Sequence, residues 1–552
     1  MEINSITRPN GISALFAIDS PSFLWHGMSP MKRLLGVFCT TVFLLNGLTK
    51  VIAEPTLKLH FAGIETLTKR EDAKTLRAIW NQKQTREFRT EVLGKLAKHL
   101  ASLSGTNSSQ FKYILTDLGL GETVLKVEPG NKGPNISLMA SMSNARGKEW
   151  IKQLKQVANR AGATLQEQQQ GGVPGWRADF EKGRSLGFGY VNGWMLVGIG
   201  QATFKPLKQA ARKINEEGRA IPTDTENDLT IEVQASALPT IIKNQIPESA
   251  NSIRLTSHLK KDNFFTKAVI TFNKEFPNKI DNWEIPTRTI TEPLVSFTAA
   301  RGIGLSTAQE VLNPLQLKPT NNQFFAWSQG RTKFQSFFSV KVDDPKTEIS
   351  NLAKRIGDFK KPGNDGEKYI GNVVHDPKKP SVTWGNVPLF APYLTSGNSA
   401  DKGYVVGGVF PPDPIKNPIP QQLLGEFINK KNLVYYNWEI TGQRLEKWNL
   451  LIQFAAILSD RREQLINKTK GIAFITSLYP KLGNTITDAT FNSNTLTITR
   501  KSHLGLSALE IALATRWLDN PRFPELTLEW PKTTEVPKAN SQRIKKNPSV
   551  NK

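Results

Sequence analysis

The chain has 552 residues, and its 72 lysines and arginines outnumber its 48 aspartates and glutamates, giving a formal net charge of +24. This length predicts two to four domains, because a domain typically takes about 100–200 residues. The single cysteine excludes a disulfide framework and a cysteine-based zinc or iron–sulfur site within one chain, while 38% hydrophobic residues suffice for large cores.

The first recognisable element is an export signal at residues 31–53. It contains a basic start, an uncharged apolar run and a more polar stretch, in that order (MKRLLGVFCTTVFLLNGLTKVIA). This order is typical of a secretory signal, and the apolar run is shorter than the roughly 20 residues of a membrane-spanning helix. We expect cleavage between Ala53 and Glu54 and a mature protein in the periplasm or outside the cell. An uncleaved N-terminal anchor and a buried helix are the alternatives.

Residues 1–30 precede this signal, and we expect them to be either a wrongly assigned start or an extended N-terminus. Because a signal normally begins at its basic start, we expect translation to begin at Met28 or Met31. The only cysteine, Cys39, lies inside the apolar run, and the bulky Phe38 before it argues against lipidation. A mature chain without cysteine relies on its hydrophobic cores for stability.

Helices and strands follow each other through the first half of the mature chain. Apolar residues that recur every three or four positions predict helices, and alternating ones predict strands. The strongest local signal is Asn192-Gly193 between two apolar runs, because both residues tolerate the positive φ of a tight hairpin turn. The predicted elements are two helices within 71–103, a strand at 136–142, a helix at 150–161, a strand around 176–180, a hairpin at 186–199, a helix at 204–214, a strand at 229–235 and a hairpin at 253–272.

The second half repeats this order roughly 200 residues later, a spacing too long for the ~20–50-residue repeats of a solenoid. Its elements are a strand at 334–342, a helix at 347–356, a strand at 404–410, a helix at 421–428, a strand at 433–440 and a hairpin at 486–499, with extra helices at 444–458 and 507–518.

The repeated order predicts an α+β fold with two similar domains, at 54–290 and 291–530. Each domain would consist of an antiparallel sheet packed with helices on one face. The alternative is one large sheet that is continuous across both halves. The polar, basic and proline-containing residues 531–552 are expected to form a disordered tail.

Several short motifs resemble segments of a family of exported bacterial proteins of unknown function. They are residues 61–63 (FAG) before the first helices, 187–198 (GFGYVNGWMLVG) in the first hairpin, 297–302 (FTAARG) and 322–327 (NQFFAW). The resemblance covers most of residues 56–530. It implies export and a duplicated α+β build. Because the family has no assigned activity, the resemblance implies no catalytic residue.

Motifs of catalytic and cofactor sites are missing from the sequence. It has no HExxH zinc motif, no G-x-S-x-G nucleophile elbow and no Walker-A phosphate loop. Two carboxylate pairs have simpler explanations. Asp179 and Glu181 fit a solvated strand face, and the pair Asp343-Asp344 before Pro345 fits a helix cap. We therefore expect no metal site and no cofactor.

The excess of basic residues suggests an anionic partner. On the predicted helix at 150–161 and just before it, Lys148, Lys152 and Lys155 form a basic stripe opposite an apolar one. Such a stripe could bind an anionic envelope polymer or an acidic lipid surface, whereas export removes most nucleic acid from reach. The leading hypothesis is an exported, non-enzymatic binding or structural protein of the cell envelope. The alternative is an extracellular or periplasmic hydrolase with a site between the two domains.

Overall fold

The computed structural model describes residues 57–524 with internal gaps. The gaps are residues 105–107, 131–133, 161, 171–172, 181–183, 202–203, 221–226, 238–248, 276–279, 303–314, 316, 331–333, 360–371, 377, 379, 386–391, 398–400, 411–416 and 459–468. The expected signal, its cleavage point at Ala53 and Glu54, residues 1–30 and the tail at 531–552 lie outside the described residues.

The described strands form one 20-stranded antiparallel sheet. From its outer edge inwards, the first half of the chain contributes β4 (Thr164–Gln170), β5 (Val173–Phe180), β6 (Arg184–Val191), β7 (Trp194–Gly200), β3 (Asn135–Ser141), β2 (Thr123–Glu128), β1 (Leu57–Phe61), β8 (Leu229–Gln234), β9 (Ala250–Lys260) and β10 (Asn263–Phe272).

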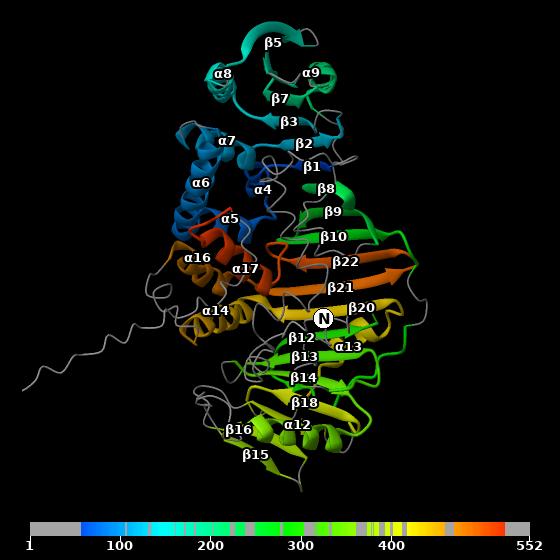
Figure 1. Cartoon of the computed structure of the whole chain (residues 1–552). Coiled ribbons are helices and arrows are strands. Elements are labelled where there is room, and N and C mark those ends of the chain that lie inside the picture. Colours follow the sequence, from blue (N-terminus) through cyan, green and yellow to red (C-terminus); the bar gives the residue numbers. More distant parts are fainter. Residues whose placement is uncertain are drawn as a thin grey trace, which may run out of the picture.

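The second half continues the same sheet, because β10 pairs with β22. From this junction outwards the strands are β22 (Thr495–Ser502), β21 (Asn484–Asn492), β20 (Leu433–Ile440), β12 (Leu294–Arg301), β13 (Gln323–Gln329), β14 (Ser336–Lys341), β18 (Tyr404–Gly408), β17 (Tyr393–Ser396), β16 (Ser381–Gly385) and β15 (Asn372–Asp376). Figure 1 shows this succession of strands from β5 at the top to β15 at the bottom.

The α+β class and the antiparallel sheet are thus confirmed, and the sheet is continuous across both halves, as in the alternative architecture. A small second sheet joins β11 (Thr291–Glu292) to β19 (Asn417–Pro418). The helices are α4 (Ile64–Lys69), α5 (Lys74–Asn81), α6 (Lys83–Ser104), α7 (Ser108–Leu120), α8 (Asn144–Arg160), α9 (Phe204–Glu217), α12 (Pro345–Phe359), α13 (Gln421–Ile428), α14 (Thr441–Leu458), α16 (Lys470–Leu478) and α17 (Ala508–Asp519).

The prediction that helices cover one face only is wrong. Along β7, Met195 and Val197 pack in one core cluster with Trp150 of α8. The alternating residues Trp194 and Leu196 pack in another cluster with α9. Successive side chains of a strand point to opposite faces, so α8 and α9 lie on opposite sides of the sheet. The physical reason is the nearly continuous apolar run of β7, which is typical of a strand buried on both faces.

The structure confirms the predicted hairpins at 186–199 and 253–272, and the turn of each has the backbone conformation of a tight hairpin. Asn192 and Gly193 have positive φ values of 40° and 87° between β6 and β7. The second hairpin joins β9 to β10, and its turn residues Lys261 and Asp262 also have positive φ. Positive φ at both central residues gives the turn a twist that matches the right-handed twist of the paired strands.

The helices at the strand ends form a separate layer. Figure 1 shows α5, α6, α7, α14, α16 and α17 together on one side of the ladder of strands. Residues of α5, α14, α16 and α17 share one apolar core cluster. Among the described helices, none is long and apolar enough to cross a membrane.

Candidate functional site on the exposed face of the central strands

The six strands β1, β8, β9, β10, β22 and β21 in the middle of the sheet have two unlike faces. One face is buried and apolar, with residues such as Leu59, Ile231, Ile253, Ile270 and Ile498 in a single core cluster. The opposite face carries Lys58, Glu232, Arg254, Lys267 and Lys501, together with many threonines, and its side chains are half-buried or exposed. We call this second surface the central polar face.

The strand register brings basic side chains of the central polar face into one line. Residues that oppose each other on paired antiparallel strands point to the same side, so Lys58, Glu232 and Arg254 form one row. Lys267 lies on the next strand, β10, and opposes Thr256, which is one row beyond Arg254. Lys501 lies on the strand after that, β22, and is one row beyond Lys267 in the same direction. With Lys126 of β2 opposite Lys58, the cations of the line are Lys126, Lys58, Arg254, Lys267 and Lys501.

One acidic residue interrupts this cation line. Glu232 lies between two of its members, with Oε2 3.7 Å from Lys58 Nζ and Oε1 3.3 Å from Arg254 Nε. The side chains of Lys58 and Arg254 remain 55% and 57% exposed. Exposed ion pairs of this kind contribute at most about 1 kcal/mol, so Glu232 orients the two cations without removing them from reach of a ligand.

Two aromatic rings lie next to the cation line. His258 and Phe265 oppose each other on β9 and β10, with ring centroids 5.4 Å apart and an interplanar angle of 11°. On the other side of Phe265, Lys501 Nζ is 5.9 Å from the ring centroid. The face therefore combines positive charge with a half-buried pair of stacked aromatic rings.

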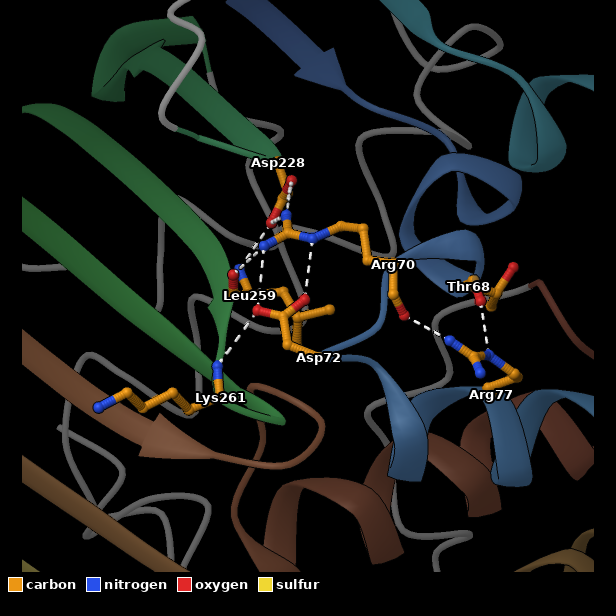
Figure 2. A network of polar contacts seen from close by, with 7 residues as sticks. All are labelled: Thr68, Arg70, Asp72, Arg77, Asp228, Leu259 and Lys261. Carbon is orange, nitrogen blue, oxygen red and sulfur yellow. Dashed lines mark hydrogen bonds and ion pairs between the residues drawn. The ribbon is translucent and has the colours of Figure 1, made fainter.

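A polar network fixes one end of this face (Figure 2). Arg70, which follows α4, donates to Asp72 and Asp228 at 3.1 Å and to the carbonyl oxygen of Leu259 on β9. Asp72 accepts a hydrogen bond from the backbone N–H of Lys261 in the β9–β10 turn. The hydrogen bond from Arg70, its largest influence, lowers the pKa of Asp72 below the usual 3.8. The network connects the first helices to the hairpin that carries Arg254 and Lys267.

The same hairpin turn is held by the start of α5. Asp262 Oδ1 accepts from the backbone N–H of Thr75 at 2.8 Å, and Oδ2 accepts from the Thr75 hydroxyl at 2.6 Å. Lysine and aspartate are less suited than Asn-Gly to a turn with positive φ at both positions. The contacts to Asp72 and Thr75 offset this local cost and keep the β9–β10 register fixed.

The basic stripe predicted on α8 is only partly a free surface. Lys148 and Lys152 are exposed. Lys155 is half-buried, and its Nζ lies 3.9 Å from the centroid of the Trp176 ring on β5. A cation–π contact of this kind occupies the ammonium group. Binding of a ligand by this stripe stays a prediction.

In the two carboxylate pairs of the sequence, Asp179/Glu181 and Asp343-Asp344, Asp179 and Asp344 have different surroundings in the structure. Arg177 Nε donates to Asp179 Oδ1 at 2.7 Å on β5, whereas Glu181 lies outside the described residues. Asp344 caps α12, since its Oδ1 accepts from the backbone N–H of Lys346 at 3.0 Å. A hydrogen bond from the Thr347 hydroxyl is the main cause that lowers the pKa of Asp344. The predicted cap at Asp343-Asp344 is confirmed, with Asp344 as the capping residue.

Two buried glutamates lie near each other behind the central strands. Glu510 of α17 forms a two-point ion pair with Arg500 of β22, at 2.5 and 3.1 Å. Glu439 of β20 accepts from the backbone N–H of Ala508 at 2.7 Å, and burial raises the pKa of Glu439. Each carboxylate therefore has a structural partner, which is Arg500 of β22 for Glu510 and the N-terminus of α17 for Glu439, and neither faces the central polar face.

The motifs at 297–302 and 322–327 also have structural roles. Arg301 is buried and donates at 2.7 Å to the carbonyl oxygens of Leu433 and Asp281. Its guanidinium lies 4.4 Å from the centroid of the Trp283 ring. Gln323 donates to the carbonyl oxygen of Asn282 at 2.6 Å. These side chains fasten the segment before β11 to β12 and β13.

Comparisons with known proteins give no related protein from which the role of the site could be inferred. No family model, no curated protein and no solved structure matches the chain. In the part of the chain that the structure describes, no group of three or more histidine, cysteine, aspartate or glutamate residues could hold a metal ion.

The sequence analysis did not find the cation line, although a local signal was present. In β9, Arg254, Thr256 and His258 alternate with buried residues, and Lys267 occupies the same kind of position in β10. This alternation predicts one exposed face per strand. It does not reveal that the exposed faces of six strands, from both halves of the chain, lie side by side.

Proposed function

We propose that the protein is a non-enzymatic binding protein of the cell envelope that binds an anionic partner through the central polar face. The observation that carries the proposal is the cation line of Lys126, Lys58, Arg254, Lys267 and Lys501, which lies on the part of the sheet face between the strands that α9 covers and those that α13 covers. A surface with an excess of one charge attracts a partner of the opposite charge and speeds their association.

The location in the envelope belongs to the same proposal. It rests on the signal-like residues 31–53, with cleavage between Ala53 and Glu54 and release into the periplasm or medium. Export also favours an envelope polymer or lipid over nucleic acid as the anionic partner. Recovery of a chain that begins at Glu54 from fractionated cells would support this part. A full-length chain in the cytosol would contradict it.

We further propose that the chain consists of two similar domains that arose by duplication, with a boundary near residues 290–291. The support is the strand order. Across the sheet, the strands of the first half lie side by side in the order β4-β5-β6-β7-β3-β2-β1-β8-β9-β10. The second half has the equivalent order β15-β16-β17-β18-β14-β13-β12-β20-β21-β22.

The helices support this duplication. In the first half α8 follows the third strand and α9 follows the seventh, and in the second half α12 and α13 have the same two places. Under this proposal β10 and β22 are equivalent strands, and the sheet is continuous because they pair with each other antiparallel. The central polar face then extends across the junction between the two domains.

Charge reversal on the face tests the binding function. The double variant Arg254→Glu/Lys267→Glu should elute from a heparin matrix at much lower salt than the unaltered protein, because exposed charge interactions are screened within about 10 Å at 0.1 M salt. The matched control is Lys83→Glu/Arg212→Glu, which makes the same charge change at two side chains that are each 77% exposed on helices.

The outcome of this experiment separates the candidate surfaces. Equal loss of retention in the face variant and in the control would mean that only net charge matters, and it would contradict the proposal. Lys148→Glu/Lys152→Glu tests the stripe on α8 in the same way. Strong loss in that variant alone would move the binding site to α8.

A further inference from the structure

We propose that the ligand of the central polar face is an anionic polysaccharide that lies across the strands, along the cation line and over the His258–Phe265 ring pair. This inference rests on the proposed binding function and adds the chemical class of the ligand and its direction on the sheet. It depends on three properties of the face, which are the spacing of its cations, its twist and the groups between the cations.

The spacing of the cations suits a linear polyanion. Neighbouring strands lie about 4.8 Å apart, and side chains on one face of a strand repeat every ~6.8 Å, so a step of one strand and one row is about 8 Å. Arg254, Lys267 and Lys501 are separated by two such diagonal steps. The line therefore crosses the strands with well-separated positive charges, which matches a polymer that has one anionic group per sugar or per pair of sugars.

The twist of the sheet favours a flexible chain over a flat surface. Adjacent strands rotate by roughly 20–25° relative to each other. From β2 to β22 the cation line crosses β1, β8, β9 and β10, so its direction of exposure turns by about 100° in all. A planar bilayer can contact only part of such a line at once, whereas a polysaccharide can follow it.

The groups between the cations fit the chemistry of sugars. Threonines line this face, such as Thr256 beside Lys267, and Thr497 and Thr490, which oppose each other. Hydroxyl side chains can both donate and accept hydrogen bonds, as the hydroxyl groups of a sugar require.

The ring pair fits the other part of a sugar. The rings of His258 and Phe265 stack on each other, and the aromatic edge that they present beside the cation line is a surface against which the C–H face of a sugar ring can pack. Lys501, whose Nζ lies near the same ring, can then pair with an anionic substituent of that sugar. Charge, hydroxyl groups and a ring surface together distinguish a polysaccharide from a simple polyanion.

Glu232 has a definite role in this arrangement. Its carboxylate lies between Lys58 and Arg254 and repels any anionic group that approaches this part of the line. It therefore limits the charge density that the site accepts and favours a polymer with spaced charges over a dense one. We infer that Glu232 is a specificity-determining residue of the face.

The test compares three probes with the full-length protein at fixed salt. The probes are alginate as an anionic polysaccharide, inorganic polyphosphate as a polyanion without sugars, and vesicles that contain phosphatidylglycerol. We expect alginate to bind most tightly. The variant Phe265→Leu should weaken alginate binding about tenfold, since aromatic contacts at binding sites commonly contribute more than 1 kcal/mol. Its affinity for polyphosphate should change less than about twofold.

Further variants keep the test independent of folding. Phe265→Tyr retains a ring and should restore alginate binding, and unfolding curves of both Phe265 variants show whether the fold is intact. Glu232→Gln should raise affinity for polyphosphate about threefold or more relative to its effect on alginate, because one repulsive charge is removed.

Each result has one meaning. Equal binding of alginate and polyphosphate with no effect of Phe265→Leu would overturn the polysaccharide inference, although charge-dependent binding by the face would stand. Tight binding of vesicles alone would assign the face to lipid headgroups and would also overturn the inference. The proposed function itself would be overturned if no probe bound and if Arg254→Glu/Lys267→Glu did not change the salt concentration at which the protein elutes from the heparin matrix.

Discussion

One face of the sheet has opposite character on β8 of the first half and on β20 of the second half. On β8 of the first half it carries Thr230 and Glu232. On β20 of the second half it carries Tyr436 and Trp438. The register shows that these are the same face, because opposed residues lead from Thr230 through Lys267 to Tyr436. One side is open and charged, and the other is apolar and largely covered.

The difference comes from what packs on each side. Tyr436 and Phe297 share a core cluster with Leu424 of α13 and with Ile290, and Trp283 packs against that cluster. The segment that contains Trp283 and Ile290 follows β10 and crosses to the second half. Strands with the same order in a sheet can therefore form a core or a binding face, depending on whether a covering segment is present and apolar.

The largest effect is expected where the cover is fastened. Arg301→Ala should lower the free energy of unfolding by about 3 kcal/mol, because it leaves the buried carbonyl oxygen of Leu433 without its donor and also removes the hydrogen bond to the carbonyl oxygen of Asp281. Denaturant unfolding measures this loss, and a dye that binds apolar surface should report exposure of the cluster around Phe297. The matched control is Arg254→Ala on the open side. An equal loss of unfolding free energy in Arg301→Ala and Arg254→Ala would contradict the distinction between the covered and the open part of the sheet face.

A smaller effect is expected at the network that holds the open side. Asp72→Asn should lower the free energy of unfolding by about 1 kcal/mol at pH 7, because the ionised carboxylate bonds Arg70 and the Lys261 N–H. The pKa of Asp72 is lowered in the folded state, so its contribution is present above the usual value of 3.8 and is lost as the pH falls through the folded-state pKa.

The pH profile makes this prediction specific. Unfolding curves of the unaltered protein and of Asp72→Asn should differ at neutral pH and converge as the pH falls below 3.8. Asp179→Asn, on β5 far from the network, is the control. A difference that stays constant at low pH would mean that Asp72 acts by its shape and not by its charge.

The smallest effect on stability is expected on the central polar face itself. Lys58→Ala should change the free energy of unfolding by less than about 0.5 kcal/mol, because its side chain is 55% exposed and its ion pair with Glu232 is a surface pair. The same variant should lower the salt concentration at which the protein leaves a heparin matrix. Destabilisation similar to that of Arg301→Ala would show that the open side contributes to a core.

Local patterns predicted much of the fold. The hairpins at 186–199 and 253–272 and the helices at 204–214 and 421–428 lie in the structure as β6–β7, β9–β10, α9 and α13. These elements have strong periodicity or a turn with positive φ, which depend on neighbouring residues alone. Short strands such as β1, β16 and β17 were not predicted, because four or five residues are too few to show a period.

The site was predicted less well than the fold. The stripe of Lys148, Lys152 and Lys155 follows from helical spacing, but helical spacing does not show that Lys155 packs on Trp176 of β5. The cation line has no linear motif, since Lys58 and Lys501 are separated by almost the whole described chain and belong to strands that are joined only through the register of the sheet.

The sequence by itself determined the α+β class, the turns and the alternation of buried and exposed residues, because these depend on side-chain polarity and on backbone preferences over a few residues. Only the tertiary structure decided which exposed strand faces lie next to each other. The pairing of β10 with β22 joins the two halves, and the segment around Trp283 covers one side and leaves the other open. Long-range strand pairing depends on the register of distant residues, and that register placed the scattered cations in one line.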